Sequence, residues 1–291
     1  MPIVFNLIRK NPKKMKKLIL LFLVLSVYTQ AHAQEGNFAN VNGVEIYYEV
    51  HGEGEPLVMI HGFTLNHTMW DQFIEDFSEN FKVILVDIRG HGKSTNPTNN
   101  FTHKESAKDI YGLMDTLQID SFKGIGFSSG GMSLTHMATM DSTRIEAMVL
   151  IGSTSFFPEP AREILRSINF DAIHEDWMNR LKQDHVSGVP QIRNIITQWK
   201  SVTNSYDDMN FTPPYLSTIK AQTLIIHGDR DPFFPIDIPV TSYKNIPNSY
   251  LWVVPNFGHQ GFDIAGDEKD PLWADTYVTV VKQFLSGEWD E

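Results

Sequence analysis

Ser128 is the residue whose surroundings most clearly indicate chemistry in this chain. It lies in the run Gly126-Phe127-Ser128-Ser129-Gly130, where the glycine–serine–glycine spacing is that of a nucleophile elbow. Such an elbow is a sharp turn between a strand and a helix that presents a serine. Because the backbone at that serine is strained, a side chain at Gly126 or Gly130 would collide with the turn. The pattern is short, so its meaning depends on the rest of the chain.

A serine hydroxyl needs a base to take its proton, and this base is usually a histidine oriented by a carboxylate. The apolar stretch 223–228 runs into Asp229-Arg230-Asp231, and the stretch 250–254 is followed by His259. Serine, acid and histidine therefore follow one another in the order associated with the elbow. The acid and the histidine each come just after a predicted strand, which is where open α/β sheets place their sites.

Short apolar strands alternate with helices around Ser128, Asp231 and His259, and these elements must position the three side chains. A strand pair is predicted over 39–50, turning at Asn42-Gly43. Further strands are predicted at 57–60, 83–86, 122–127, 147–151, 223–228 and 250–254, and helices at 68–78, 104–117, 132–140 and 270–285. This alternation predicts an α/β fold with a doubly wound, mostly parallel sheet. Residues 154–219 interrupt it with helical patterns punctuated by prolines and are predicted to form a helical insertion.

Four motifs, in this order, resemble those of the α/β-hydrolase fold family in its capped, esterase-like form, and the similarity extends from about residue 40 to residue 285. They are His61-Gly62-Phe63, residues 87–94, the run around Ser128, and the turns Gly228-Asp229-Arg230-Asp231 and Gly258-His259. The resemblance implies an α/β-hydrolase fold in which residues of about 154–219 form a helical cap over the site. It also implies that Ser128 is the nucleophile, His259 the base and Asp231 the acid. The backbone N–H groups of Phe63 and Ser129 would form the oxyanion hole.

Neighbouring residues offer alternatives to these assignments. Asp229 shares the acid turn, and we interpret it as a turn residue that accepts hydrogen bonds from local backbone N–H groups. Ser129 is not midway between the two glycines. Among the 11 histidines, His61 and His91 are interpreted as loop residues that bond the backbone near the site, His136 and His227 as packing residues, and His67 as a packing residue or one at the pocket mouth.

A serine nucleophile forms acyl-enzymes with carbonyl substrates. Members of the family that cleave epoxides or carbon–halogen bonds use aspartate instead, so serine at position 128 disfavours both reactions. Aromatic and methionine residues of the insertion favour an apolar acyl or alcohol group: Phe156, Phe157, Trp177, Met178, Trp199, Tyr206, Met209, Phe211 and Tyr215. We expect a small or medium apolar carboxylic ester. The alternatives are a lactonase, a C–C bond hydrolase, a perhydrolase, an aminopeptidase, or a non-catalytic ligand-binding protein on the same scaffold.

Residues 1–33 have the pattern of a secretory signal peptide. Six basic residues between positions 9 and 17 precede the apolar run 18–25 and Ala31-His32-Ala33. The run is shorter than the ~20 residues of a membrane span, so we expect no stable membrane insertion after cleavage, with an uncleaved anchor as the alternative. Cleavage after Ala33 would leave residues 34–291 as a secreted or periplasmic domain that begins at Gln34. Met15 is a more usual start for such a peptide than Met1.

Charge and composition limit the kinds of molecule that we expect the protein to bind. Without residues 1–33 the chain has 18 basic and 35 acidic residues, a net charge of −17, which disfavours nucleic acid and anionic membranes as partners. The chain has no cysteine and no metal-binding motif, so we expect neither a metal nor another cofactor. We expect a small ester-like molecule as partner, and the sequence leaves the oligomeric state open.

Overall fold

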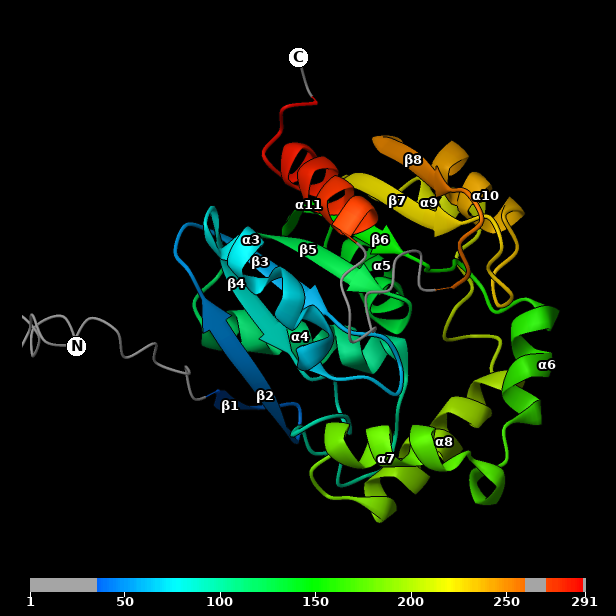
Figure 1. Cartoon of the computed structure of the whole chain (residues 1–291). Coiled ribbons are helices and arrows are strands. Elements are labelled where there is room, and N and C mark those ends of the chain that lie inside the picture. The colour runs from blue at the N-terminus through cyan, green and yellow to red at the C-terminus, as the bar shows by residue number, and fades with distance from the viewer. Residues whose placement is uncertain (1–35, 260–270, 290–291) are drawn as a thin grey trace, which may run out of the picture. The chain divides into compact units, whose positions relative to one another are not determined.

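An eight-stranded sheet forms the centre of the computed structural model, which describes residues 36–259 and 271–289. The strands lie in the order β1-β2-β4-β3-β5-β6-β7-β8 (Figure 1). They are β1 (Asn37–Val41), β2 (Val44–His51), β3 (Glu55–Ile60), β4 (Phe81–Val86), β5 (Phe122–Phe127), β6 (Ile145–Ile151), β7 (Gln222–Gly228) and β8 (Ser249–Val254). All neighbours from β4 to β8 are parallel, so the prediction of a mostly parallel sheet is confirmed.

The first two strands form the predicted hairpin. Their turn residues Asn42 and Gly43 have φ angles of 47° and 79°, the positive values that a two-residue type I′ turn requires at both positions. β2 then pairs antiparallel with β4 and joins the hairpin to the parallel strands.

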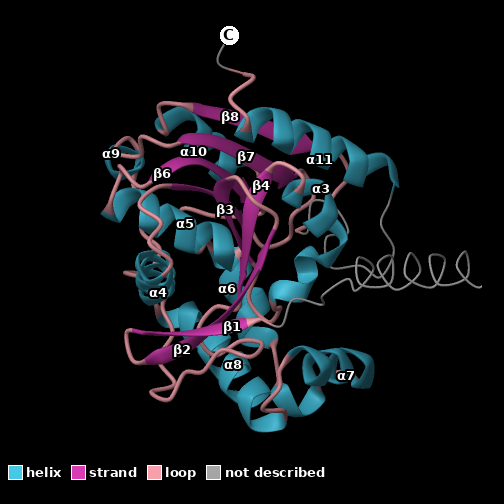
Figure 2. Ribbon diagram, turned by 90° about the vertical axis from the view of Figure 1, so that its left-hand side faces the viewer, coloured by secondary structure: helices cyan, strands magenta, loops and turns pink. Residues whose placement is uncertain are grey.

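Alternate side chains of the central strands enter two separate cores. Val58 and Ile60 of β3 pack in one hydrophobic cluster, whereas Leu57 and Met59 pack in the other. Successive side chains of a strand point to opposite faces, and both faces of this sheet are covered by helices. Figure 2 shows these two helical layers on either side of the sheet.

The first layer contains α4 (His103–Thr116), α5 (Ser129–Met140) and α10 (Asp237–Asn245), and the second contains η1 (His67–Phe73), α3 (Ile74–Ser78) and α11 (Pro271–Leu285). The predicted helix 68–78 differs in its first half, which is a 3₁₀ helix. Both the backbone N–H and the ring of His67 are bonded to Asp87, and these bonds fix the first turn of η1. The doubly wound α/β fold predicted from the sequence is confirmed.

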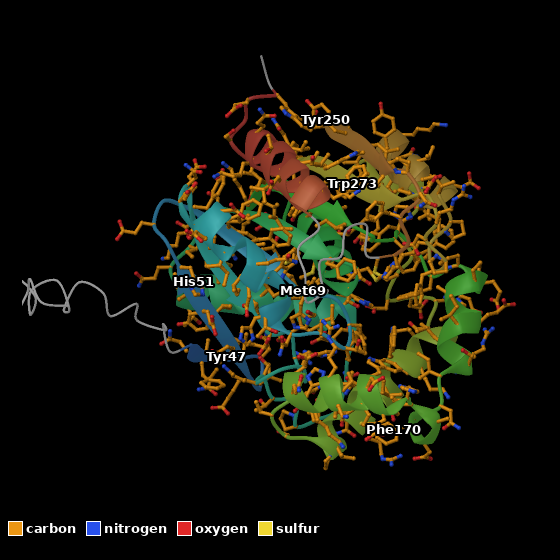
Figure 3. All side chains as sticks on the ribbon, viewed as in Figure 1. Tyr47, His51, Met69, Phe170, Tyr250 and Trp273 are labelled. Carbon is orange, nitrogen blue, oxygen red and sulfur yellow. The ribbon has the colours of Figure 1, made fainter. Side chains whose placement is uncertain are left out.

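Short helices fill the insertion between β6 and β7. They are α6 (Glu159–Ser167), η2 (Phe170–Ala172), α7 (Glu175–Asp184), α8 (Val189–Ser201), η3 (Val202–Asn204) and α9 (Pro213–Leu216). Prolines stand at the first turns of α6, α8 and α9, where a missing N–H costs nothing. Part of the insertion has a small core of its own: Leu181, Ile192 and Ile196, with Phe170 packed against them. Figure 3 shows Phe170 among α7 and α8, away from the sheet.

Two predictions lie outside the described residues. These are the signal peptide of residues 1–33 and the beginning of the last helix at Asp270. Among the described residues, no helix has both the length and the apolar character needed to cross a membrane.

Candidate active site

Ser128 lies between the end of β5 and the start of α5, in the sharp turn expected of an elbow. Its φ and ψ are 49° and −113°, an unusual conformation for a residue with a side chain. The turn is held on both sides, because the Ser128 N–H donates to the carbonyl of Ile151 at 2.8 Å and its carbonyl accepts from Met132 at 3.0 Å. The strain is therefore compensated by bonds to a strand and a helix.

The two flanking glycines are needed for close backbone contacts. A Cβ on Gly126 would come within 2.5 Å of the backbone nitrogen of Gly131, inside the turn itself. A Cβ on Gly130 would come within 2.1 Å of the carbonyl oxygen of Ile60, at the end of β3. The expected collision with the turn thus holds for Gly126, whereas at Gly130 the collision is with the neighbouring strand.

His259 and Asp231 meet Ser128 across the carboxyl ends of the strands. The Nε2 atom of His259 lies 3.0 Å from the Ser128 Oγ, and its Nδ1 atom lies 2.8 Å from an Asp231 Oδ2. The Asp231 side chain is 1% exposed, and its other oxygen accepts the backbone N–H groups of Phe233 and Phe234 at 2.8 and 3.0 Å. These bonds fix the carboxylate. The structure thus brings together the three side chains that the sequence singled out.

The Asp231 carboxylate also determines which nitrogen of the His259 ring carries the proton. Asp231 can only accept when it is ionised, so His259 donates its Nδ1–H to it and leaves Nε2 to accept the Ser128 hydroxyl. The rings of Phe127, Phe233 and Phe234 pack around His259 at centroid distances of 5.4, 4.8 and 5.2 Å. The arrangement can take a proton from Ser128 and return it to a group bound beside it.

Asp229 has a different contact. Its Oδ1 accepts the backbone N–H of Asn256 at 2.5 Å, which links the turn after β7 to the turn after β8. Asn256 has a φ of 62°, so this bond supports a second unusual backbone conformation. The contact agrees with the interpretation of Asp229 as a turn residue.

Phe63 and Ser129 line the same cavity as Ser128. Within the described part of the chain, neither backbone N–H donates to a protein acceptor. Two backbone N–H groups beside a nucleophile are what a tetrahedral oxyanion requires. The positions suit the oxyanion hole expected from the sequence.

Buried histidines support the loop that carries Phe63. His61 accepts the backbone N–H of Ile88 at Nε2, at 3.0 Å, and contacts the carbonyl of Gly62 through Nδ1, at 2.7 Å. His185, from the insertion, accepts the N–H of Gly92 at Nδ1 and contacts the carbonyl of Thr64 through Nε2. Each ring therefore accepts at one nitrogen and donates at the other, which only the neutral imidazole can do. Burial accordingly lowers the pKa of both His61 and His185 to about 4.

We expect acidification to destabilise the protein through these histidines. The unfolded chain binds their protons near pH 6.5, but the folded chain binds them only near pH 4. The stability that the two neutral rings add to the free energy of unfolding is therefore complete above pH 6.5. It is lost as the pH falls, at about 1 kcal/mol per pH unit for each ring. Urea unfolding at pH 7, 6 and 5 measures this slope. His185→Gln retains a donor and an acceptor without titrating, so it should flatten the slope, and an unchanged slope would contradict the assignment.

His67 does not lie at the pocket mouth, which was one of its two expected places. Its backbone N–H and Nδ1 are 2.7 and 2.8 Å from Asp87, and its Nε2 is 3.2 Å from Glu49. It packs on the ring of Tyr47, which is labelled on β2 in Figure 3. Burial alone would lower the pKa of His67, but the two carboxylates raise it. The residue belongs to the packing beneath the loop 87–94. His61 and His91 bond the backbone of their loops, and His136 and His227 are buried, as expected.

A cavity of about 20 Å³ lies beside Ser128, which is room for about one water molecule. The insertion contributes four of the residues around it, so this part of the chain borders the site. The described lining residues are Phe63, His103, Ser128, Ser129, Met132, Phe157, Leu165, Trp199, Val202, Phe233, Phe234 and His259.

Only Phe157 and Trp199, of the nine candidates in the insertion, line this cavity. Trp177 and Met178 pack inside the insertion. Met209 and Phe211 are buried in the same core as Val58 and Ile60 of β3. Phe156, Tyr206 and Tyr215 are exposed. Seven of the nine candidates therefore do not line the cavity.

The sequence interpretation missed Phe233 and Phe234, whose position directly after Asp231 on the acid turn was a usable signal. It also missed His103, which approaches the site from the first residue of α4. No local pattern marked His103, because its partners in space lie 26 and 105 residues away in the chain.

Comparisons with known proteins bear on the family and the fold of this chain. A family model described as the alpha/beta hydrolase fold matches residues 55–189. A putative non-heme chloroperoxidase of Synechocystis is 27% identical over 266 residues, which cover 79% of this chain and 93% of that protein. The pimeloyl-[acyl-carrier protein] methyl ester esterase of Nitrosomonas europaea is 26% identical over 250 residues, which cover 75% of this chain and 93% of that protein.

A solved structure, the meta-cleavage product hydrolase from Pseudomonas fluorescens IP01, superposes with a TM-score of 0.69 at 22% identity. The match covers 87% of this chain and 98% of that one, and it shows a common fold.

Proposed function

This chain belongs to the α/β-hydrolase fold family, and from that premise we propose that it is a serine hydrolase that forms an acyl-enzyme on Ser128. The observation that carries the proposal is the continuous hydrogen-bonded series from Ser128 through His259 to Asp231. In this series the serine lies at a strained turn beside two backbone N–H groups that donate to no acceptor among the described residues, and this combination favours catalysis over ligand binding.

The contacts suggest the following sequence of proton transfers. Ser128 Oγ attacks the substrate carbonyl while His259 Nε2 takes its proton, and Asp231 stabilises the imidazolium that forms. The N–H groups of Phe63 and Ser129 hold the oxyanion. His259 then returns the proton to the leaving-group oxygen, and a water molecule, activated by the same nitrogen, hydrolyses the acyl-enzyme.

The mostly apolar lining of the cavity supports a small or medium apolar carboxylic ester as the substrate class. Eight of its described lining residues are apolar, and the phenyl rings around His259 would surround the reacting bond. The relative from Nitrosomonas europaea bears the name of a methyl ester esterase, which agrees with this class. The same three residues would serve a lactonase, a C–C bond hydrolase, a perhydrolase or an aminopeptidase, so substrates of these enzymes belong in the same panel.

Labelling with a fluorophosphonate is the experiment that tests the activated serine. We expect one adduct per protein chain, mapped to Ser128 by mass spectrometry, because only an oriented base makes a serine react with this reagent. The adduct should disappear in His259→Ala and after heat denaturation. Absence of an adduct on the native protein would favour the non-catalytic alternative.

We also propose, from the sequence of residues 1–33 alone, that the protein is secreted or periplasmic. The mass of the exported protein tests this, since cleavage after Ala33 makes Gln34 the first residue. An N-terminus that retains residues 18–25 would indicate an anchored protein instead.

A further inference from the structure

A second serine, histidine and aspartate are bonded beside the first three. Ser129 Oγ lies 3.0 Å from Nε2 of His103, and the Nδ1 of that ring lies 2.7 Å from an Asp208 Oδ2. The same ring nitrogens are used as in His259. All three side chains are buried: Ser129 begins α5, His103 begins α4, and Asp208 comes from the insertion.

Asp208 is held firmly enough to set the proton positions on His103. Its carboxylate accepts the backbone N–H groups of His103 and Lys104, at 2.9 and 3.2 Å, and its carbonyl accepts from the His136 ring at 2.6 Å. Burial alone would raise the pKa of Asp208, but His103 and His136 hold that pKa well below its ordinary value. The ionised carboxylate takes the Nδ1–H of His103. Nε2 therefore accepts the hydroxyl proton of Ser129.

Ser129 and His103 are the remaining polar side chains around the cavity. Apart from Ser128 and His259, the described residues that line it are apolar except for Ser129 and His103. Packing alone does not account for Ser129 and His103, since apolar residues of the same volume fill a core at least as well as buried polar residues do. A polar pair in an apolar cavity, next to the proposed nucleophile, is suited to recognising a polar group of the substrate.

We propose that the Ser129 hydroxyl, oriented by His103 and Asp208, binds a hydroxyl group on the acyl part of the substrate, close to the scissile carbonyl. The preferred substrates would then be esters of hydroxy acids. This inference rests on the proposed function and specifies its substrate class.

The directions of the hydrogen bonds select this group. Because the proton of Ser129 is donated to His103, its oxygen offers only lone pairs to the cavity, and the substrate must supply a donor. A neutral hydroxyl meets this need without placing a charge among phenyl rings. The acyl side is indicated because the leaving-group oxygen must lie at the Nε2 of His259, whereas Ser129 is bonded to the other histidine.

The test compares the methyl esters of butanoate, 2-hydroxybutanoate, 3-hydroxybutanoate and 3-methoxybutanoate. We expect kcat/KM for one hydroxylated ester to exceed that for the unsubstituted ester by roughly 10- to 100-fold, as for one hydrogen bond in a dry site. The methoxy ester, which cannot donate, should lose this advantage. In Ser129→Ala the ratio between hydroxylated and unsubstituted esters should fall to about 1. Ser133→Ala is the matched control, because Ser133 is buried in the same helix and is not among the lining residues.

Binding of the same esters to the Ser128→Ala protein separates this inference from the proposed function. Tighter binding of a hydroxylated ester, lost in the Ser128→Ala/Ser129→Ala double variant, supports the inference even if the native protein hydrolyses none of them. Hydrolysis or binding at equal strength for hydroxylated and unsubstituted esters overturns it. Nitrogen-15 NMR of His103 gives an independent check: a proton on Nδ1 supports the assigned hydrogen-bond directions, and a proton on Nε2 contradicts them.

Discussion

Replacing Ser128 by alanine is expected to lower kcat/KM for ester hydrolysis by about 10⁶-fold, the loss typical when the nucleophile of such a triad is removed. The hydroxyl oxygen is the only atom lost, and it is the atom that lies 3.0 Å from the base. Alanine has the same Cβ as serine at the strained φ of 49°, and the backbone bonds to Ile151 and Met132 do not involve the side chain. We therefore expect the thermal midpoint to stay within a few degrees of the native value.

Ser133→Ala controls for the removal of a buried serine hydroxyl from α5, and it should keep the native rate. The experiment also distinguishes Ser128 from Ser129, the adjacent serine, whose hydroxyl is likewise bonded to a histidine. If Ser128→Ala retained turnover comparable with the native protein, the nucleophile would have to be sought elsewhere, and Ser129 would be the first candidate.

The contrast between these two serines shows what the sequence could predict. Gly126, Ser128 and Gly130 form a local pattern in the sequence, although only Gly126 is required by the turn itself and Gly130 is required by the neighbouring strand β3. The strands were equally visible, because each central strand is buried on both faces and forms a short apolar run. Resemblance to a known family then placed His259 and Asp231. In the structure, His259 is bonded to Ser128 and Asp231 is bonded to His259.

The second series was invisible in the sequence for a physical reason. Asp208 lies in the insertion, where no regular period links it to α4, and its bond to His103 forms only when the insertion folds back on the first layer of helices. The cap aromatics failed as predictors for a related reason. An apolar residue in a helical insertion can face its own small core, as Trp177 and Met178 do, or the site, as Trp199 does. Only the tertiary packing decides between them.

Asp231→Asn is expected to lower kcat by about 10⁴-fold, whereas Asp229→Asn should cost far less. The asparagine amide can place an N–H where Asp231 now accepts, which would favour the imidazole form with its proton on Nε2. That proton would face Ser128 and remove the acceptor for its hydroxyl. At position 229 an asparagine oxygen still accepts the N–H of Asn256, so the turn is retained.

The two variants together assign the acid, because they make the same chemical change two residues apart on one turn. Steady-state kinetics on one ester, with the thermal midpoint of each variant, give the comparison. Equal losses would mean that the turn after β7 acts through its shape, and a larger loss at Asp229 would transfer the role of the acid to that residue. The expected order follows from geometry. Asp231 is the buried carboxylate that lies 2.8 Å from the Nδ1 of His259, whereas Asp229 accepts the backbone N–H of Asn256.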